Sequence, residues 1–293
     1  MESKLVSVII LTYNRAALVK ESIESILAQT YAQFELIIVD DGSTDGTEQM
    51  IQQMHDERIR YFKFDHCGHT GKLKNFAMKQ AKGEYIAFND SDDNWKPAKL
   101  EKQIKLFEEC GDIGFSITDV ITFSKDGILI EHSYHSDQLK ECSSIFDGMR
   151  KSKFLVYPFT LVIRKNCLEK VGWFDEDLIS GDYHFIMRLA YLFKAGILYE
   201  PLVWRRVHDS NMSNQYPFEN YGEVIATFEL LYRNRWIETK HLRTARSIAF
   251  YRMAELLDKM GKRVEARKQF IRSIGQRWYH VDSYIGLIKT LIG

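Results

Sequence analysis

Strand-sized apolar runs alternate with helix-sized segments over the first 110 residues of this chain. The runs are rich in β-branched and aromatic residues, which is typical of buried parallel strands. They cover residues 6–11, 34–39, 59–64 and 85–89. Apolar residues recur at helical spacing in the segments 17–29, 72–82 and 97–110. This order predicts a mostly parallel sheet flanked by helices, whose ligands bind beyond the carboxyl ends of the strands.

Three carboxylates follow the fourth run within four residues, at Asp90, Asp92 and Asp93. Carboxylates this close repel one another strongly unless a cation lies among them. Hard oxygen ligands suit Mg²⁺ or Mn²⁺, and such ions usually bridge to phosphates. A solvated turn is the alternative interpretation, because Asp and Asn favour turns after strands. The segment, which includes Ser91, therefore indicates either a phosphate-linked metal site or an acidic turn.

Polar residues also follow the first two runs, at the same predicted edge of the sheet. The second run ends at Asp40 and Asp41, where a carboxylate can accept the imide N–H of a uracil ring or a ribose hydroxyl. The first run is followed by Thr12, Tyr13, Asn14 and Arg15. Tyr13 can stack on a base and Arg15 can bind a phosphate. The alternatives are an ordinary turn that caps a helix and a loop that leads into one.

Three further segments carry residues suited to chemistry. His69 and Lys74 surround the predicted start of a helix beside a glycine, which suits a diphosphate or a base edge. Their spacing is not that of a phosphate-binding loop, which argues against a Walker-type nucleotidase. Asp182 begins an amphipathic helix, so it is a candidate general base or simply a helix cap. His208 follows the last strand and is either a metal or diphosphate ligand or an ordinary polar residue.

The remainder of the chain predicts one mixed domain and a helical extension. Asp126–Gly127 separates two strand-like runs and is a hairpin signal. Further strands are expected at residues 159–164 and 197–207, with a helix at 181–194 between them. We therefore expect a nucleotide-binding and catalytic domain over residues 1–215 and a helical extension over residues 216–293.

The extension has two features of its own. Residues 251–274 carry large and small residues at spacings that resemble one tetratricopeptide unit, a helical hairpin that cannot form a solenoid alone. An apolar stripe with helical spacing follows at Val281, Tyr284, Ile285, Ile288, Leu291 and Ile292. Residues 233–280 contain 13 Lys and Arg against 4 Asp and Glu. The stripe is therefore expected either to pack onto the domain or to lie on an anionic membrane surface.

Composition narrows the function classes. The formal net charge is zero, so no global field favours nucleic acid as a partner. The four cysteines, Cys67, Cys110, Cys142 and Cys167, are scattered without metal-ligand spacing. We therefore expect free thiols and no zinc site. No secretory signal and no run long enough to span a membrane are recognised, which favours a cytoplasmic protein, either free or at the inner face of the membrane.

The combined segments resemble glycosyltransferase family 2. The resemblance rests on residues 6–15, 34–47 and 82–95 and extends over roughly residues 4–213. It implies the A-type nucleotide-sugar transferase fold and an inverting, metal-dependent enzyme of the hexosyltransferase type. It also implies a nucleotide-sugar donor, with UDP favoured, and a glycan or lipid-linked acceptor in surface polysaccharide synthesis. A nucleotide-sugar-binding scaffold without transfer activity is the alternative function.

The resemblance assigns a role to each candidate residue. Thr12, Tyr13 and Asp40 would line the nucleoside pocket, with Asp40 on the base, and His69 and Lys74 would lie near the base or the phosphates. Asp90 and Asp92 match the Asp-x-Asp motif, with Asp92 the main metal ligand and Asp93 sharing that duty.

The resemblance also extends to the acceptor side of the site. Asp182 matches the catalytic base, Trp95 lies where an acceptor sugar would stack, and His208 matches a histidine that closes over the diphosphate. The chain departs from the family pattern at Gly181, where a Glu is common, and at Lys74, where an Arg is common.

Overall fold

A computed structural model describes residues 4–134, 142–151, 153–178, 180–209, 211 and 217–292. The chain divides into two compact units, Met1–His208 and Asp209–Gly293. The domain boundary predicted at residues 215 and 216 lies outside the described residues. Every candidate site residue belongs to the first unit.

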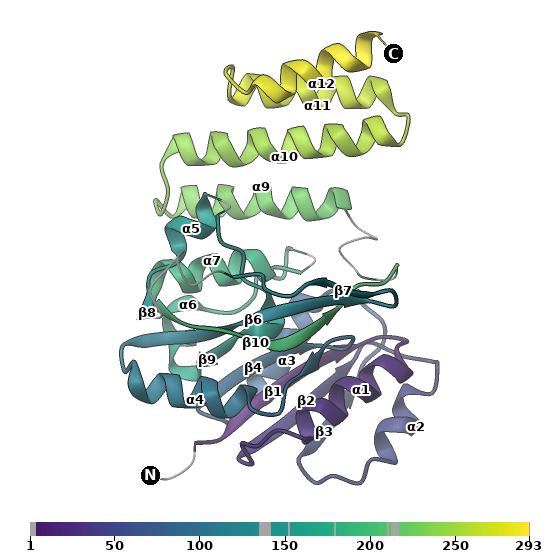
Figure 1. Cartoon of the computed structure of the whole chain (residues 1–293), viewed down its shortest axis with the longest axis vertical. Helices are drawn as coiled ribbons and strands as arrows, with labels where there is room; N and C mark the ends of the chain where they lie inside the picture. Colours follow the sequence, from purple (N-terminus) through teal and green to yellow (C-terminus); the bar gives the residue numbers. More distant parts are fainter. Residues whose placement is uncertain are drawn as a thin grey trace. The chain divides into compact units, whose positions relative to one another are not determined.

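The first unit is built on one mixed sheet, shown in Figure 1. Four of its strands are parallel neighbours in the order β3-β2-β1-β4. They are β3 (Ile59–Lys63), β2 (Phe34–Asp40), β1 (Val6–Thr12) and β4 (Tyr85–Asp90). These are the four strands that the apolar runs predicted. The predicted mostly parallel α/β architecture is therefore confirmed.

The sheet continues through the second half of the unit. Beyond β4 the order is β9 (Val162–Arg164), β6 (Ile113–Ser124), β10 (Lys194–Arg206) and β5 (Asn94–Trp95). Strand β9 is antiparallel to both of its neighbours, whereas β6 and β10 are parallel. The predicted hairpin at Asp126–Gly127 joins β6 to β7 (Gly127–Ile130). Strand β8 (Cys142–Ser143) pairs with β10.

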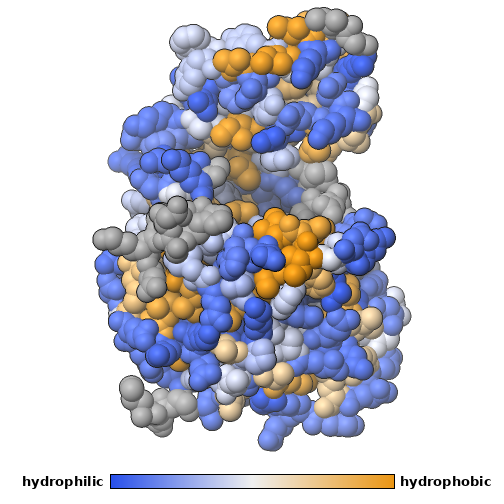
Figure 2. Space-filling model, viewed as in Figure 1, coloured by the Kyte–Doolittle hydropathy of each residue, from blue (hydrophilic) through white to orange (hydrophobic). Residues whose placement is uncertain are grey.

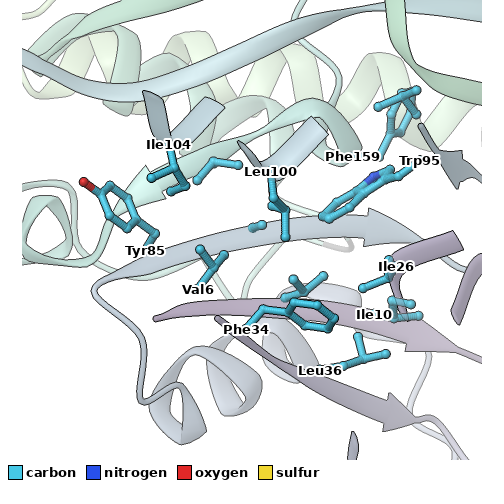
Figure 3. Packing of buried hydrophobic residues seen from close by; sticks show 14 of the residues in the cluster. Val6, Ile10, Ile26, Phe34, Leu36, Tyr85, Trp95, Leu100, Ile104 and Phe159 are labelled. Carbon is cyan, nitrogen blue, oxygen red and sulfur yellow. The ribbon is translucent and has the colours of Figure 1, made fainter. Parts of the chain in front are cut away.

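Helices flank this sheet. They are α1 (Ala16–Leu27), α2 (Thr47–Gln52), α3 (Thr70–Gln80), α4 (Lys99–Glu109), α5 (Phe146–Arg150), α6 (Leu168–Val171) and α7 (Asp182–Leu192), with short 3₁₀ helices at Pro158–Thr160 and Lys165–Cys167. Successive side chains of a strand point to opposite faces of the sheet. On one face, Val6 and Ile10 of β1 pack in a single core cluster with Ile26 of α1 and Leu100 of α4 (Figure 3). This packing holds the carboxyl ends of the parallel strands in fixed positions.

One expectation about cysteine is wrong. The structure joins Cys110 to Cys142 in a disulfide across a sequence separation of 32 residues, with Cα atoms 6.5 Å apart. Cys110 caps the end of α4, and the pairing of β8 with β10 brings Cys142 beside it. Spacing in the sequence gave no sign of the contact because strand pairing creates it. Cys67 and Cys167 are free thiols, as expected.

The second unit is helical, as predicted. Its helices are α9 (Pro217–Arg233), α10 (Thr239–Lys259), α11 (Arg263–Gln276) and α12 (Val281–Ile292). Ala254 of α10 packs with Ala266 and Phe270 of α11, and Gly261 supplies the left-handed residue, φ 75°, at the turn between them. None of the helices in the described part of the chain has the length and apolar character that a membrane span requires.

Candidate active site

The loops after β1 and β2 are bonded to each other at the carboxyl edge of the sheet. The Asn14 side chain accepts the backbone N–H of Thr44 at 2.8 Å, and the Asn14 N–H donates to the Ser43 hydroxyl at 2.8 Å. Asn14 has a left-handed backbone, φ 50°, which Asn tolerates better than most residues. Asn14 therefore organises these loops.

Tyr13 and Asp41 shape the wall of this edge. The exposed Tyr13 ring stacks on His66 with centroids 4.0 Å apart. The Asp41 carboxylate accepts the backbone N–H groups of Cys67 and Gly68 at 2.8 and 2.9 Å. Asp41 thus fixes the loop before α3, and Tyr13 presents one ring face beside it.

Two buried polar atoms have no hydrogen-bond partner among the described residues. One lies at the end of β1 and the other just before α3. They are the Thr12 hydroxyl oxygen and the His69 Nδ1 atom. Buried polar groups are nearly always satisfied by protein or by a bound molecule. Both residues were predicted to bind the nucleotide, and their unused bonding capacity fits a polar ligand.

The three predicted acidic residues form one cluster. Asp90, Asp92 and Asp93 each offer an oxygen atom, and these atoms all lie within 4.8 Å of one another. Asp92 and Asp93 are buried, whereas Asp90 has exposed surface although protein atoms crowd around its carboxyl group. Buried Ser91 lies between them in sequence. The strand end thus concentrates negative charge in a small volume.

Side-chain and backbone nitrogen atoms surround the cluster. Arg15 Nη1 donates to Asp92 Oδ2 at 2.8 Å, and His208 Nε2 lies 3.0 Å from the same oxygen. The backbone N–H of Arg206 donates to Asp93 Oδ1 at 2.9 Å. Arg15 and His208 therefore both contact Asp92, although the three residues follow three different strands, β1, β10 and β4.

Mutual repulsion changes the ionisation of the cluster. Shielding of the Asp90 carboxyl from bulk water, and then the charge of Asp92, raise the pKa of Asp90 to about 7. Burial, followed by the charges of Asp90 and Asp92, raises the pKa of Asp93 well above its usual range. A cation among the carboxylates would favour their ionised forms.

The donor set fits a divalent cation. Three carboxylates within ligand distance of one another provide the hard oxygen atoms that Mg²⁺ and Mn²⁺ prefer. His208 contacts the same side of the cluster through Asp92. Asp90, Asp92 and Asp93 are therefore close enough together to share one ion, whereas His208 lies outside this group and contacts it through Asp92.

Asp182 lies at the start of α7 and forms an ion pair with Lys74 of α3, which is 108 residues away in sequence. The Ser180 hydroxyl donates to the other Asp182 oxygen at 2.5 Å. The charges of Asp182 and Lys74 both act on Asp90. The candidate base, its lysine partner and the acidic cluster thus belong to one electrostatic site.

The departure from the family pattern at Gly181 has a structural reason. Gly181 adopts φ 67°, and a Cβ atom there would lie 3.2 Å from the Asp175 carbonyl oxygen. A Glu at this position would be strained and crowded. Lys74, rather than a neighbouring carboxylate, is the charged partner of Asp182.

Two predicted contacts do not fit the structure. Asp40 is fully buried, and its carboxylate accepts the Tyr61 hydroxyl at 2.6 Å and the Ser43 N–H at 2.8 Å. It stabilises the loop after β2 and offers no exposed oxygen to a base. Trp95 is only 3% exposed, with the Lys99 ammonium 3.7 Å from its ring centroid. Because its ring belongs to the core (Figure 3), Trp95 cannot stack on an acceptor sugar.

Sequence reasoning missed four contacts. Arg206 bonds to Asp93 through its backbone and pairs with Glu21 through its side chain. Ser180 orients Asp182, and its position two residues before a candidate base was an available signal. The pairing of Lys74 with Asp182 had no signal in the sequence, because only the fold brings α3 and α7 together.

Comparison with known proteins gives a family match. The model described as Glycosyl transferase family 2 matches residues 7–172. An uncharacterized glycosyltransferase of Rickettsia typhi is 32% identical over 219 residues, 72% of this chain and 67% of that protein. The Escherichia coli UDP-Glc:alpha-D-GlcNAc-diphosphoundecaprenol beta-1,3-glucosyltransferase WfaP is 40% identical over 131 residues, 45% of this chain. That match spans 49%, about half, of the WfaP length.

Solved structures share the fold at low sequence identity. Residues 1–349 of S. aureus TarS in complex with UDP-GlcNAc align with a TM-score of 0.69 and 20% identity, over 97% of this chain and 88% of that one. The mannosyltransferase PcManGT from Pyrobaculum calidifontis, in complex with GDP-Man and Mn²⁺, aligns with a TM-score of 0.58 and 18% identity, over 97% and 86%. The predicted A-type transferase architecture is therefore confirmed.

Proposed function

Because the chain belongs to glycosyl transferase family 2, we propose that it moves a sugar from a nucleoside-diphosphate donor to a hydroxyl group of a glycan or lipid-linked acceptor. The observation that carries this proposal is the position of Asp182. Its carboxylate is held by Lys74 and Ser180 and interacts electrostatically with the acidic cluster at the end of β4. Sugar transfer requires a base and a diphosphate site on either side of the anomeric carbon of the donor sugar.

The donor would bind across the carboxyl edge of the sheet. Tyr13 offers an exposed ring for a base, while Thr12 and His69 offer unused polar atoms. Asp41 and Arg15 would complete the nucleotide pocket, and Asn14 would fix its loops. UDP is the proposed carrier because WfaP, 40% identical over 131 residues, is named for a UDP-Glc donor.

The chemistry we propose is one in-line displacement. Asp182 would remove the proton of the acceptor hydroxyl as its oxygen attacks the anomeric carbon, on the face opposite the leaving diphosphate. A single displacement inverts the configuration at that carbon. Lys74 donates to one oxygen of the Asp182 carboxylate and Ser180 donates to the other, so the protein fixes the orientation of the carboxylate.

Asp90, Asp92 and Asp93 would hold Mn²⁺ or Mg²⁺, with His208 beside them. When bound, the ion would stabilise the negative charge of the departing diphosphate. Arg15 would add positive charge at the same end of the sheet, since it already donates to Asp92. Ser91, buried between the acidic residues, would help to fix the spacing of the cluster.

The acceptor class is proposed from a relative. WfaP, which is 40% identical over 131 residues, is named for transfer to a diphosphoundecaprenol-linked sugar. A lipid-linked acceptor of this kind would place the enzyme in the cytoplasm at the inner membrane face, in surface polysaccharide synthesis. The helical second unit, which we interpret as partly tetratricopeptide-like, would then contact a partner or the membrane.

A transfer assay tests the proposal. Purified protein is supplied with UDP-sugars, Mn²⁺ and a lipid-linked acceptor, and product is measured before and after EDTA. We expect metal-dependent transfer, and we expect Asp182→Asn to lower kcat about 10²- to 10⁴-fold with little change in donor affinity.

Asp177→Asn is the matched control, because Asp177 is an exposed acid on the loop before α7. It should retain full turnover. Normal turnover by Asp182→Asn would refute the base assignment. Donor binding without transfer by the unaltered protein, for every acceptor offered, would favour the scaffold alternative.

A further inference from the structure

Helix α12 is amphipathic, and its apolar face is the exposed one. Val281, Ile285, Ile288 and Leu291 lie on one face, and their exposed fractions are 64%, 46%, 52% and 61%. Tyr284 extends the same face and is 40% exposed. Figure 2 shows hydrophobic residues gathered over this helix. The apolar stripe predicted from the sequence therefore does not pack against the other helices of its own unit.

The opposite face of α12 makes the contacts with its own unit, through small and polar residues and through Leu287, which packs against the cluster of Ala254, Ala266 and Phe270. Ser283 and Thr290 are buried, with exposed fractions of 0% and 1%. The Ser283 and Ser273 hydroxyls lie 2.7 Å apart, and Ser273 bonds in turn to Ser247 of α10. A Cβ atom at Gly286 would lie 2.3 Å from the Phe270 ring. The close approach at Gly286 fixes which face of the helix turns outward.

This choice of face runs against the usual rule. A surface helix normally buries its apolar stripe and exposes its polar residues. Exposing five large apolar residues on one helix forgoes their burial, which is worth about 1.5–3 kcal/mol for each fully buried side chain. An exposed contiguous apolar surface of this kind typically marks a binding site for protein or membrane.

Aromatic and basic residues adjoin the stripe. Trp278 and Tyr279, in the turn before α12, are 77% and 56% exposed. Rings of this type favour the boundary between lipid and water. Residues 263–292 carry six Lys and Arg against two Asp and Glu. Lys268, Arg272 and Lys289 are among the exposed ones.

We propose that the outer face of α12, together with Trp278 and Tyr279, docks on an anionic lipid bilayer. The apolar stripe would enter the headgroup and acyl boundary, while the surrounding cations pair with acidic lipid headgroups. This inference rests on the proposed function, because a lipid-linked acceptor must be met at a membrane surface.

Charge favours a bilayer over a second copy of the chain on the same face. Two copies that met through α12 would bring two basic surfaces together, and like charges at an interface are unfavourable. An anionic bilayer has the complementary charge.

Vesicle co-sedimentation of the full chain tests the proposal without donor or acceptor. The protein should bind vesicles that contain phosphatidylglycerol, bind those of phosphatidylcholine alone much more weakly, and dissociate as salt is raised. Ile285→Ser with Ile288→Ser should weaken binding about tenfold or more, because both side chains are exposed and only lipid contact is lost. Lys268→Gln with Arg272→Gln should weaken binding to anionic vesicles about tenfold or more.

The matched control is Ile128→Ser with Leu129→Ser. These residues of β7 are 53% and 55% exposed, so the change in surface hydrophobicity is similar to that of the α12 variant. They lie in the other unit, outside the proposed membrane-binding face. Vesicle binding of this variant should equal that of the unaltered protein. Circular dichroism melting of each variant confirms that it folds.

Three results would overturn the proposal. They are no vesicle binding by the unaltered protein, equal loss in the β7 control, and an α12-dependent dimer in light scattering without vesicle binding. The last result would identify a second copy as the occupant. Vesicle binding with no sugar transfer would leave this inference intact and refute only the proposed function.

Discussion

At the scale of single residues, the fold decides which polar groups serve the site and which serve the loops. Lys74 and Asp182 are 108 residues apart and form an ion pair. Asp40 and Asp41 are adjacent, yet Asp40 is fully buried against Tyr61 whereas Asp41 secures the loop before α3. Residue type alone suggests a ligand contact for all four. Hydrogen-bond partners separate the structural ones from the candidates for catalysis.

Lys74 is predicted to act through Asp182. The substitution Lys74→Met keeps an apolar side chain of similar length but removes the positive charge. A hydrogen bond to a charged group contributes about 1.5–3 kcal/mol, which corresponds to roughly a 10- to 100-fold loss in kcat. Donor KM should change little, and Lys74→Arg should restore part of the activity. Steady-state kinetics with varied donor provide the measurement, and a large rise in donor KM at constant kcat would instead place Lys74 on the phosphates.

Trp95 is predicted to stabilise the core and not to bind acceptor. Trp95→Ala should lower the free energy of unfolding by about 3–5 kcal/mol, since a large buried ring is lost. Urea denaturation measures this loss. Trp173→Ala is the control, because Trp173 is 43% exposed and its removal should have a small effect. A stable Trp95→Ala protein with a raised acceptor KM would restore the stacking role.

At the scale of elements, helix α7 combines the proposed base at its first residue with a buried ionisable group two residues later. Asp182 begins the helix after the left-handed Gly181. His184 is 5% exposed, and neither ring nitrogen has a hydrogen-bond partner among the described residues. Burial, and then the charge of Arg188, lower the pKa of His184 to about 4. The helix is therefore sensitive to acid near the proposed base.

His184 predicts a pH-dependent stability. The folded pKa of about 4 lies below the ordinary value of 6.5, so the unfolded chain takes up the proton first as pH falls. The stability that neutral His184 contributes is fully present above pH 6.5. It is lost as pH falls from 6.5 towards 4, by on the order of 3 kcal/mol at most.

Denaturation in urea at several pH values measures this effect. His184→Met should remove this part of the pH dependence, whereas His55→Asn should retain it. His55 is exposed, and its left-handed backbone, φ 46°, suits Asn. Identical pH profiles for His184→Met and the unaltered protein would contradict the argument.

At the scale of the whole molecule, the chain combines a sheet-based unit and a helical unit with different surfaces. The first unit gathers its acidic and basic side chains at one edge of the sheet. The second exposes an apolar helix face among basic residues. A family match over residues 7–172 describes the first unit alone, so the helical unit must be understood from its own contacts.

Donor binding should stabilise the protein measurably. By mass action, a ligand at about 100 times its Kd adds about 2.7 kcal/mol to the free energy of unfolding. A thermal-shift screen of nucleotide sugars with Mn²⁺ should therefore single out one donor, with UDP-sugars ahead of GDP-sugars. Addition of EDTA should reduce the shift. Equal shifts with all nucleotides, or none with any, would contradict the proposed nucleotide site.

The sequence by itself determined the architecture and most members of the site. Continuous apolar runs are buried on both sides, so they form parallel strands, and the carboxyl ends of such strands meet at one edge. Asp92, Arg15 and His208 each follow a strand of the sheet, and in the structure Arg15 and His208 both contact Asp92. Periodicity also located the apolar stripe of the last helix.

Only the tertiary structure decided which faces and atoms are free. Trp95 is buried because β5 pairs with β10, Cys142 reaches Cys110 because β8 pairs with β10, and Lys74 reaches Asp182 because α3 and α7 meet. Likewise, the close fit of Gly286 on Phe270 turns the apolar face of α12 outward. The physical reason is common to all four: exposure and partnership depend on contacts between distant segments, which local pattern does not encode.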